Sequence, residues 1–385
     1  MSDTRKRIDT RLIHAGALRP RPGGAVATPV FQSSTFEYAG ASDYHDVRYI
    51  RLNNTPNHTV LHDRIASLET AEAALVAASG MAAISSSLLA VVSAGDHLLA
   101  HDGLYGGTYD LLTKDLPRLG VTCTFVDADR PETWAACLTP RTRAFYVETI
   151  TNPLLQVVAL DEVVAFCRKH DLVSLIDNTL ATPVNFRPVE LGFDLVLHSA
   201  TKYLNGHSDI VAGAVAGRRD LVAGAKRTLD HLGGSLDPHA CFLLERGLKT
   251  LAVRVRHQNG SALEVARFLA GHPAVAVVHH PGLESHPRHV RARTWFSGMG
   301  GMVSFELRDG LAAAERMMSR LTIPICAPSL GGPETLVTRP ATTSHSGLDA
   351  ETRRRQGISD ALVRVSIGLE ATDDLIDDFA QALKA

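Results

Sequence analysis

Short apolar segments alternate with stretches of helical periodicity over residues 61–240. Brief apolar runs between helices are typical of a mostly parallel sheet that helices cover on both faces, so we predict an α/β fold. The expected strands are Ala74–Ala77, His97–Ala100, Thr124–Val126, Ala144–Val147, Leu172–Ile176, Asp194–Leu197 and Ala212–Ala216.

The clearest helical pattern covers residues 161–170. Acidic residues begin this segment and basic residues end it, an arrangement that suits the helix dipole. Its apolar positions recur at helical spacing and predict one buried face. These positions are Leu160, Val163, Val164 and Cys167.

The two ends of the chain differ from this middle part. Residues 1–60 contain many proline and glycine residues and little periodicity, so we expect an extended arm. Residues 61–245 then form one domain and residues 246–385 a smaller α+β domain. We expect a long helix over Cys241–Gly271, interrupted near Gly260, to connect the two domains.

The C-terminal part is expected to contain two strands and a last helix. The strands are Met302–Leu307 and Leu362–Ile367, and Thr372 is a candidate cap for the helix. The apolar face of this helix would consist of Leu375, Ile376, Phe379 and Leu383.

Composition narrows the class of protein. The chain has 385 residues, 45% of them hydrophobic and 21% charged, with a net charge of −2, which is ordinary for a globular enzyme. Nothing in this charge pattern requires a nucleic acid or a membrane as partner. No segment reaches the roughly 18 unbroken apolar residues of a membrane span, and the polar N-terminus does not resemble a secretory signal.

Cysteine and histidine usage points to the cytoplasm and to a site without metal. The five cysteines are odd in number and none are at CxxC spacing, so reduced thiols are expected. The eighteen histidines are scattered and form no HExxH motif, and we predict no metal site.

One lysine is flanked by two hydroxyl residues directly after a short apolar run. Leu195–Leu197 precedes His198, Ser199, Ala200, Thr201 and Lys202. A buried lysine loses its proton easily and can form an imine with an aldehyde. Ser199 and Thr201 would share one face of an extended segment and could hold a phosphate. Together they suggest pyridoxal 5'-phosphate (PLP); the alternative is an ordinary surface lysine.

The segment around Lys202 resembles the cysteine/methionine-metabolism family of PLP-dependent enzymes, which includes the cystathionine lyases and synthases. The resemblance extends from about Leu12 to the C-terminus. It implies the PLP-dependent transferase fold of the aspartate aminotransferase type (fold type I). It also implies a small amino-acid substrate and a homotetramer, a dimer of dimers with shared active sites.

A glycine turn between an apolar strand and a helix is a candidate phosphate site. Ser79, Gly80 and Met81 occupy this junction, where free N–H groups favour an anion. An ordinary tight turn is the alternative. The resemblance implies that the backbone N–H groups of Gly80 and Met81 bind the PLP phosphate, together with Ser199 and Thr201.

Two further residues are candidates for contact with the cofactor ring. Asp177 ends the run Leu172–Ile176, and a carboxylate at that edge of the sheet can keep a pyridine nitrogen protonated. It could instead cap the following turn. Tyr105 lies in a loop after a strand, where its ring could stack on a cofactor and its hydroxyl could assist proton transfer. A half-buried tyrosine without such a role is the alternative, and the resemblance implies stacking over PLP.

Tyr49 and Arg51 would share one face of an extended segment in the arm. The resemblance implies that this pair reaches the PLP phosphate of a neighbouring subunit, which suits the planar guanidinium group. The chain departs from the family pattern directly afterwards, because it reads Asn53-Asn54-Thr55-Pro56 where relatives usually have Asn-Pro-Thr.

Arg364 lies on a largely apolar strand and needs a carboxylate partner. A structural ion pair with an acidic residue of the protein is one explanation. The resemblance implies instead that Arg364 binds the α-carboxylate of the substrate, with help from Ser329 and Asn152.

The family contains several reactions on one scaffold. Cystathionine-specific enzymes often have a glutamate where this chain has Pro328, which argues against that reaction. Methionine γ-lyases often have a cysteine where this chain has Gly107, which argues against that reaction as well. The chain also lacks the long central insertion of many sulfhydrylases. We expect cystathionine γ-lyase-type elimination, in which Lys202 also acts as the base. The alternatives are a cystathionine γ-synthase or O-acyl-homoserine sulfhydrylase, a methionine γ-lyase, a cystathionine β-lyase, an aminotransferase, or an inactive binding protein.

Overall fold

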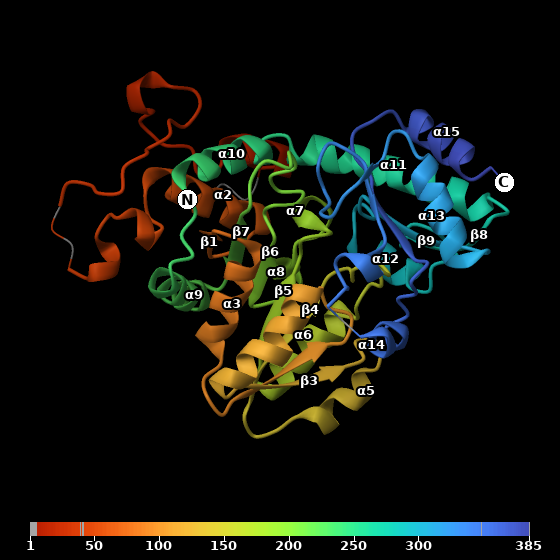
Figure 1. Ribbon diagram of the computed structural model, residues 1–385. Coiled ribbons are helices and arrows are strands. Elements are labelled where there is room, and N and C mark those ends of the chain that lie inside the picture. Colours follow the sequence, from red (N-terminus) through yellow and green to blue (C-terminus); the bar gives the residue numbers. More distant parts are fainter. Residues whose placement is uncertain (1–5, 39, 41, 348, 385) are drawn as a thin grey trace.

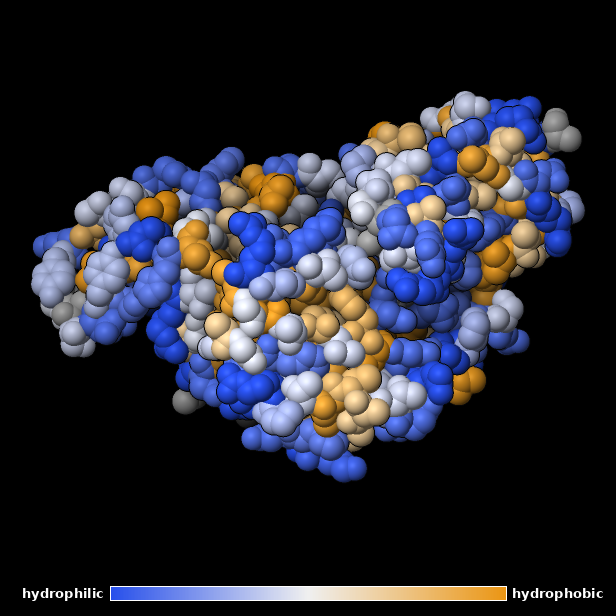
Figure 2. Space-filling model, turned by 60° about the horizontal axis from the view of Figure 1, so that its bottom comes forward, coloured by the Kyte–Doolittle hydropathy of each residue, from blue (hydrophilic) through white to orange (hydrophobic). Residues whose placement is uncertain are grey.

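The computed structural model describes residues 6–38, 40, 42–347 and 349–384. The N-terminal part contains a short helix, α1 (Ile8–His14), and a long irregular segment that leads to α2 (Pro56–Glu69). The irregular segment stands away from the body at the left of Figure 1 and Figure 2. The expectation of an arm that is extended throughout residues 1–60 is wrong, because α1 and the start of α2 are helical.

Seven strands form the larger sheet, in the order β1-β7-β6-β5-β4-β2-β3. The strands from β6 to β3 in this order pair in parallel, whereas β7 is antiparallel to both β1 and β6. Each predicted apolar run falls largely within one of these strands, so the prediction of a mostly parallel sheet is confirmed. The strands are β1 (Ala73–Ala77), β2 (His97–His101), β3 (Thr122–Val126), β4 (Thr142–Glu148), β5 (Val173–Asp177), β6 (Leu195–His198) and β7 (Gly213–Gly217).

Helices cover both faces of this sheet, which explains why most residues of its strands are apolar. Leu75 belongs to a core cluster with residues of α3 and α9, whereas Val76 belongs to a cluster on the other face that includes residues of α6. The predicted amphipathic helix is confirmed as α6, with its four apolar positions buried. The helices are α3 (Gly80–Val91), α4 (Gly106–Asp110), α5 (Pro131–Trp134), α6 (Leu160–His170), α7 (Thr182–Asn185), α8 (Pro188–Leu191) and α9 (Arg219–Leu232).

Two helices, α10 (Pro238–Leu248) and α11 (Leu251–Gly271), lead from the larger sheet to the C-terminal part (Figure 1). The expected interruption near Gly260 is wrong. The break lies at Lys249 and Thr250, where the backbone of Thr250 leaves the helical region. Gly260 lies inside α11 and a side chain there would meet open space, so nothing forces the helix to end at this glycine.

The C-terminal part is built on a second sheet of five strands, in the order β10-β11-β12-β9-β8. Val363, Val365 and Ile367 point into its apolar core, which places Arg364 and Ser366 on the opposite face. The elements are β8 (Val275–His279), α12 (His289–Trp295), β9 (Met302–Leu307), α13 (Gly310–Arg320), β10 (Ile325–Cys326), β11 (Leu336–Thr338), α14 (Ala350–Arg355), β12 (Val363–Ser366) and α15 (Thr372–Ala382).

The last helix packs as expected but is not capped as expected. Leu375, Phe379 and Leu383 are in the core, and Ile376 packs against it. Thr372 is the first helical residue, and its hydroxyl bonds to the Ser261 hydroxyl at 2.7 Å instead of capping α15. The predicted cap is therefore wrong.

The α/β architecture with a smaller α+β part is confirmed. The core of the second sheet is separate from the clusters on the two faces of the larger sheet. This separation favours a domain boundary near residue 245, which stays a prediction. In the described part of the chain, no helix combines the length and the apolar character needed to cross a membrane.

Candidate active site

A cavity of about 710 Å³ lies where the carboxyl ends of the parallel strands face the second sheet. Parallel α/β sheets commonly bind ligands at this edge. Ten of the twelve predicted site residues line the cavity, although they come from segments far apart in the sequence. They are Gly80, Met81, Tyr105, Asn152, Asp177, Ser199, Thr201, Lys202, Ser329 and Arg364.

Lys202 is half-buried in the turn that follows β6. Its Nζ donates a hydrogen bond to the Ser329 hydroxyl at 2.7 Å. Burial, together with the positive charge of Arg364, lowers the pKa of Lys202 to about 8. The amine can therefore lose its proton near neutral pH, which a nucleophile or base requires.

The hydroxyl residues beside Lys202 do not lie on an extended segment, as we expected, because residues 200–205 form turns. Both still line the cavity. The Thr201 hydroxyl already donates to the carbonyl oxygen of Ala212 at 3.1 Å and accepts from its N–H at 2.9 Å. The Ser199 hydroxyl has no hydrogen-bond partner among the described residues, so it is the freer donor for an anion.

The first turn of α3 forms one end of the cavity. Ser79 caps this helix by accepting the N–H of Ala82 at 3.0 Å. The backbone at Gly80 approaches Ser199 so closely that an added Cβ would lie 2.9 Å from the Ser199 Cβ. Only glycine fits this contact, and it leaves the free N–H groups of the helix start facing the cavity.

Asp177 ends β5 and is held by the following turn. Its Oδ1 accepts hydrogen bonds from the Thr179 N–H at 2.9 Å and from the Thr179 hydroxyl at 2.5 Å. Oδ1 of Asp177 therefore stabilises the following turn, as the alternative explanation expected. Asp177 also lines the cavity. Burial raises the pKa of Asp177, so a cation beside it would be strongly favoured.

Glu148 is a residue of the site that the sequence analysis missed. It ends β4, lines the cavity, and its Oε1 accepts the Tyr105 N–H at 2.6 Å. Burial and the charge of Asp177 raise the pKa of Glu148 well above its usual value. Its position directly after an apolar run is the same signal that identified Asp177, but no partner for it can be recognised from the sequence.

The position of the Tyr105 ring depends on Gly107, because glycine has no side chain to occupy the same space. A Cβ at Gly107 would lie 2.6 Å from Cε1 of this ring. Any larger residue at position 107 would therefore displace Tyr105. Gly107, which stands where methionine γ-lyases often have a cysteine, thus has a steric role in this chain.

Arg364 is a buried cation without a carboxylate partner. It is 3% exposed, its Nη1 donates to Asn152 Oδ1 at 3.1 Å, and its Nη2 donates to the Ser329 carbonyl oxygen at 3.0 Å. Among the described residues no acidic side chain pairs with it, and its Nε has no acceptor. Burial lowers the pKa of Arg364 to about 10, so it stays charged at neutral pH. This geometry disfavours a structural ion pair and suits an external carboxylate.

Tyr49 and Arg51 do not reach the cavity of their own chain. Tyr49 precedes a short 3₁₀ turn, Ile50–Leu52, so the expected extended segment is wrong. Arg51 Nη1 donates to the carbonyl oxygen of Asp230 at 2.9 Å, at the end of α9. Their role in a neighbouring subunit stays a prediction.

The cavity residues fit PLP at each of its functional groups. The turn of Gly80 and the Ser199 hydroxyl offer donors for a phosphate, Asp177 offers a carboxylate for a protonated ring nitrogen, and Lys202 offers an amine for the aldehyde. Within the described residues, no group of three or more His, Cys, Asp or Glu side chains is arranged to hold a metal ion.

The family model for Cys/Met metabolism PLP-dependent enzymes matches residues 9–384. Cystathionine β-lyase of Lactococcus lactis subsp. cremoris is 40% identical over 378 residues, which cover 98% of this chain and 99% of that protein. Cystathionine γ-lyase of Bacillus subtilis is 39% identical over 376 residues, which cover 97% of this chain and 98% of that protein. L-Methionine γ-lyase of Porphyromonas gingivalis is 41% identical, with 97% and 96% covered.

A solved structure has the same fold over nearly the whole chain. The crystal structure of cystathionine γ-lyase from Lactobacillus plantarum, complexed with L-serine, superposes with a TM-score of 0.93. It is 35% identical in sequence, and the match covers 98% of each chain. The similarity therefore includes both sheets.

Proposed function

Because the chain belongs to the Cys/Met metabolism family of PLP-dependent enzymes, we propose that it cleaves the carbon–sulfur bond of a sulfur-containing amino acid by γ-elimination, as a cystathionine γ-lyase does. PLP dependence and carbon–sulfur lyase chemistry follow from the family and from its relatives. The observation that supports amino-acid chemistry best is the pair formed by Lys202 and Arg364, which place an amine and an unpaired guanidinium in one cavity.

Different residues of the cavity would bind different parts of the cofactor. When bound, PLP withdraws electrons from the carbon atoms of an amino acid. Gly80, Met81 and Ser199 would hold its phosphate, and Asp177 would keep its ring nitrogen protonated. Tyr105 would lie against the ring, on the loop that Glu148 holds through the 2.6 Å hydrogen bond to the Tyr105 N–H.

Substrate binding and proton transfer fall to the other residues. Arg364 binds the α-carboxylate through its free Nε, oriented by Asn152 and by the Ser329 carbonyl. Lys202, with its lowered pKa, removes the proton from Cα and carries protons towards Cβ. The Ser329 hydroxyl orients its Nζ for this movement. A base of this kind typically contributes about 10²–10⁴ in rate.

A methionine γ-lyase is a second candidate, and the charged and apolar residues that line the cavity favour it. Among the described residues that line the cavity, four carry a charge: Glu148, Asp177, Lys202 and Arg364. All four already have a role towards cofactor, backbone or α-carboxylate, which leaves no charged group for the distal amino acid half of cystathionine. The apolar lining would suit an alkyl thioether; it consists of Ile84, Ile150, Leu180, Val211, Pro328 and Leu330.

The assembly and the cellular location belong to the same proposal. We infer a homotetramer with shared active sites, because Tyr49 and Arg51 lie on the arm and not at their own cavity. The arm projects from the body, as a segment that reaches a neighbour would (Figure 1). The five cysteines are free, which agrees with a cytoplasmic enzyme.

A product screen tests the proposed reaction. The holoenzyme is incubated with cystathionine, methionine, cysteine and activated homoserines, and ketoacid, ammonia and thiol release are measured. The γ-lyase proposal expects 2-oxobutyrate and cysteine from cystathionine, whereas the second candidate expects methanethiol from methionine. Pyruvate from cystathionine would show β-elimination, and product only when a thiol is added to an activated homoserine would show replacement.

A further inference from the structure

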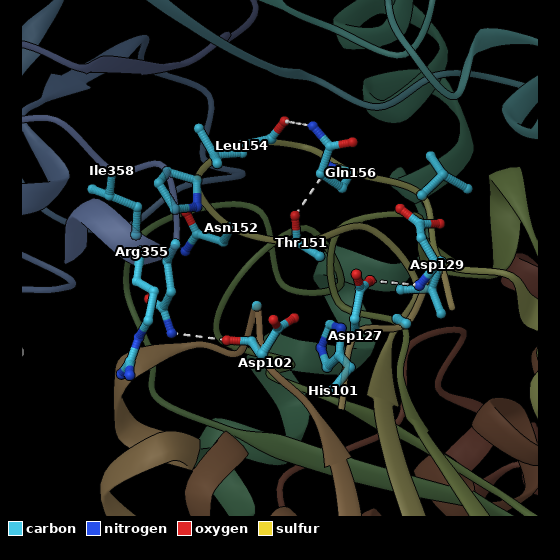
Figure 3. A pocket seen from close by; sticks show the side chains of 16 residues that line it. His101, Asp102, Asp127, Asp129, Thr151, Asn152, Leu154, Gln156, Arg355 and Ile358 are labelled. Carbon is cyan, nitrogen blue, oxygen red and sulfur yellow. Dashed lines mark hydrogen bonds between the residues drawn. The ribbon is translucent and has the colours of Figure 1, made fainter. Parts of the chain in front are cut away.

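A second cavity, of about 240 Å³, lies beside the active site, and its residues have no role in the proposed reaction (Figure 3). Asn152 lines both cavities, so the segment around it forms the wall between them. The second cavity is built at the ends of β2 and β3, where His101 and Asp102 meet Asp127 and Asp129. Arg355, the last residue of α14, and the following residues Gln356 and Ile358 close its other side.

His101 presents a buried hydrogen-bond donor to this cavity. The residue is 1% exposed, and its ring points into the space shown in Figure 3. Its Nε2 accepts the N–H of Glu148 at 3.2 Å, and a backbone N–H can only donate. Burial lowers the pKa of His101 to about 3, so the ring is neutral and its proton is on Nδ1. No described residue accepts a hydrogen bond from this Nδ1.

Two carboxylates face the same cavity without a basic partner among the described residues. Asp129 is neutralised by Arg288, at 2.6 Å, and by Arg291. Asp102 and Asp127 have no such ion pair. The pKa of Asp102 is raised, mainly because the carboxyl group is partly buried and also because of the negative charges of Asp127 and Asp129. A cation between Asp102 and Asp127 would relieve this repulsion.

The opposite side of the cavity carries a positive charge. Arg355 lines it, and the only hydrogen bond of its guanidinium to a described residue is to the Thr352 hydroxyl at 3.4 Å. Gln356 donates to the carbonyl oxygen of Asp102 at 2.8 Å and keeps the two sides together. The cavity thus offers carboxylates for a cation and, beside them, the N–H donor of His101 for an anion, while Arg355 adds a positive charge at the opposite edge.

We propose that this second cavity binds a small free amino acid. The ammonium group lies between Asp102 and Asp127, and the carboxylate faces the Nδ1–H of His101. The bound amino acid is connected to the active site, because His101 bonds to the N–H of Glu148 and Glu148 bonds to the N–H of Tyr105.

Calorimetry of the holoenzyme with N,N-dimethylglycine tests this proposal. This probe is a zwitterion, and its tertiary ammonium group cannot condense with an aldehyde, so it cannot react with the cofactor. We expect one saturable site per chain that persists in the Arg364→Ala variant, because Arg364 is the cation that would hold the probe's carboxylate at the active site. Asp102→Asn and Asp127→Asn should each weaken it about tenfold or more, because each removes a charged hydrogen-bond partner.

Three controls separate this site from the active site and from loss of fold. Asn at position 127 keeps the oxygen that accepts the Asp129 N–H at 2.9 Å, and unchanged cofactor absorbance shows that each variant is folded. Asp115→Asn, at the exposed end of the helical segment Leu111–Asp115, should leave probe binding unchanged, and Arg364→Ala should leave binding to the second cavity in place. No saturable binding, or binding that Arg364→Ala abolishes and the Asp102 and Asp127 variants leave intact, would overturn the proposal. Neither result depends on which carbon–sulfur bond the enzyme cleaves.

Discussion

Lys202 Nζ donates a hydrogen bond to the Ser329 hydroxyl over 2.7 Å, although 127 residues separate them in the sequence. Lys202 follows a strand of the larger sheet, and Ser329 belongs to the segment between β10 and β11 of the second sheet. The bond therefore joins the two parts of the molecule at the reacting atom. Any motion of one sheet relative to the other would change the position of the amine.

Lys202→Ala should remove the yellow colour of the holoenzyme and lower its activity by at least about 10²–10⁴. The variant lacks both the amine that joins the cofactor and the base. Absorbance spectra and ketoacid release measure the two effects. Lys114→Ala, at an exposed lysine paired with Asp110, is the matched control and should change neither. Full activity of the Lys202 variant would contradict this assignment.

The apoenzyme should take up PLP faster as the pH rises through about 8, because only the neutral amine of Lys202 reacts and its folded-state pKa is lowered to about 8. Burial and the charge of Arg364 both favour the neutral form. Arg364→Gln removes that charge, so the midpoint should move to higher pH. Stopped-flow absorbance at a series of pH values gives both midpoints. A wild-type midpoint near 10, or a shift to lower pH in the variant, would argue against this electrostatic account.

Arg364→Ala should raise KM for the amino-acid substrate and leave cofactor binding intact. The loss of charged hydrogen bonds to the α-carboxylate costs about 1.5–3 kcal/mol, which corresponds to roughly ten- to more than hundredfold in KM. Arg256→Ala, which removes an exposed ion pair with Asp9, is the control. A colourless Arg364 variant would show that the residue serves the cofactor instead.

Gly107→Cys should lower activity, because its Cβ would lie 2.6 Å from the Tyr105 ring and displace it. The absorbance of the bound cofactor and kcat/KM report this change. Gly260→Ala is the matched control: a Cβ there meets open space inside α11, and helix propensity predicts a gain of up to roughly 1 kcal/mol in stability with unchanged activity. An active Gly107→Cys variant with unaltered spectrum would refute the steric role.

Mixing two inactive variants should restore activity if Arg51 serves a neighbouring subunit. Arg51→Ala and Lys202→Ala are unfolded and refolded together, so that mixed oligomers form. In these oligomers one active site combines an intact Lys202 with an intact Arg51 from the other chain. Each variant refolded alone is the control. No recovery in the mixture, or an active monomer on size-exclusion chromatography, would exclude shared sites.

Local sequence patterns predicted the strands and those site residues that lie directly at strand ends and helix starts, whereas the proposed roles of Tyr49, Arg51, Asn152 and Ser329 come from the resemblance to the family. Asp177, Ser199 and Gly80 are of this kind. The turns after β6 and around Arg51 were not predicted, since hydrogen bonds to distant residues such as Ala212 and Asp230 determine them. Glu148 was missed because its partner, Tyr105, is 43 residues away. The break before α11 depends on the backbone of Thr250, where the sequence has no proline or glycine.

The central claim is that Lys202 carries the cofactor. Borohydride reduction of the yellow holoenzyme, followed by digestion and mass spectrometry, tests it most directly. The account predicts a phosphopyridoxyl group on the peptide that contains Lys202 and on no other lysine. A modification on a different lysine, or none in a protein saturated with PLP, would contradict it.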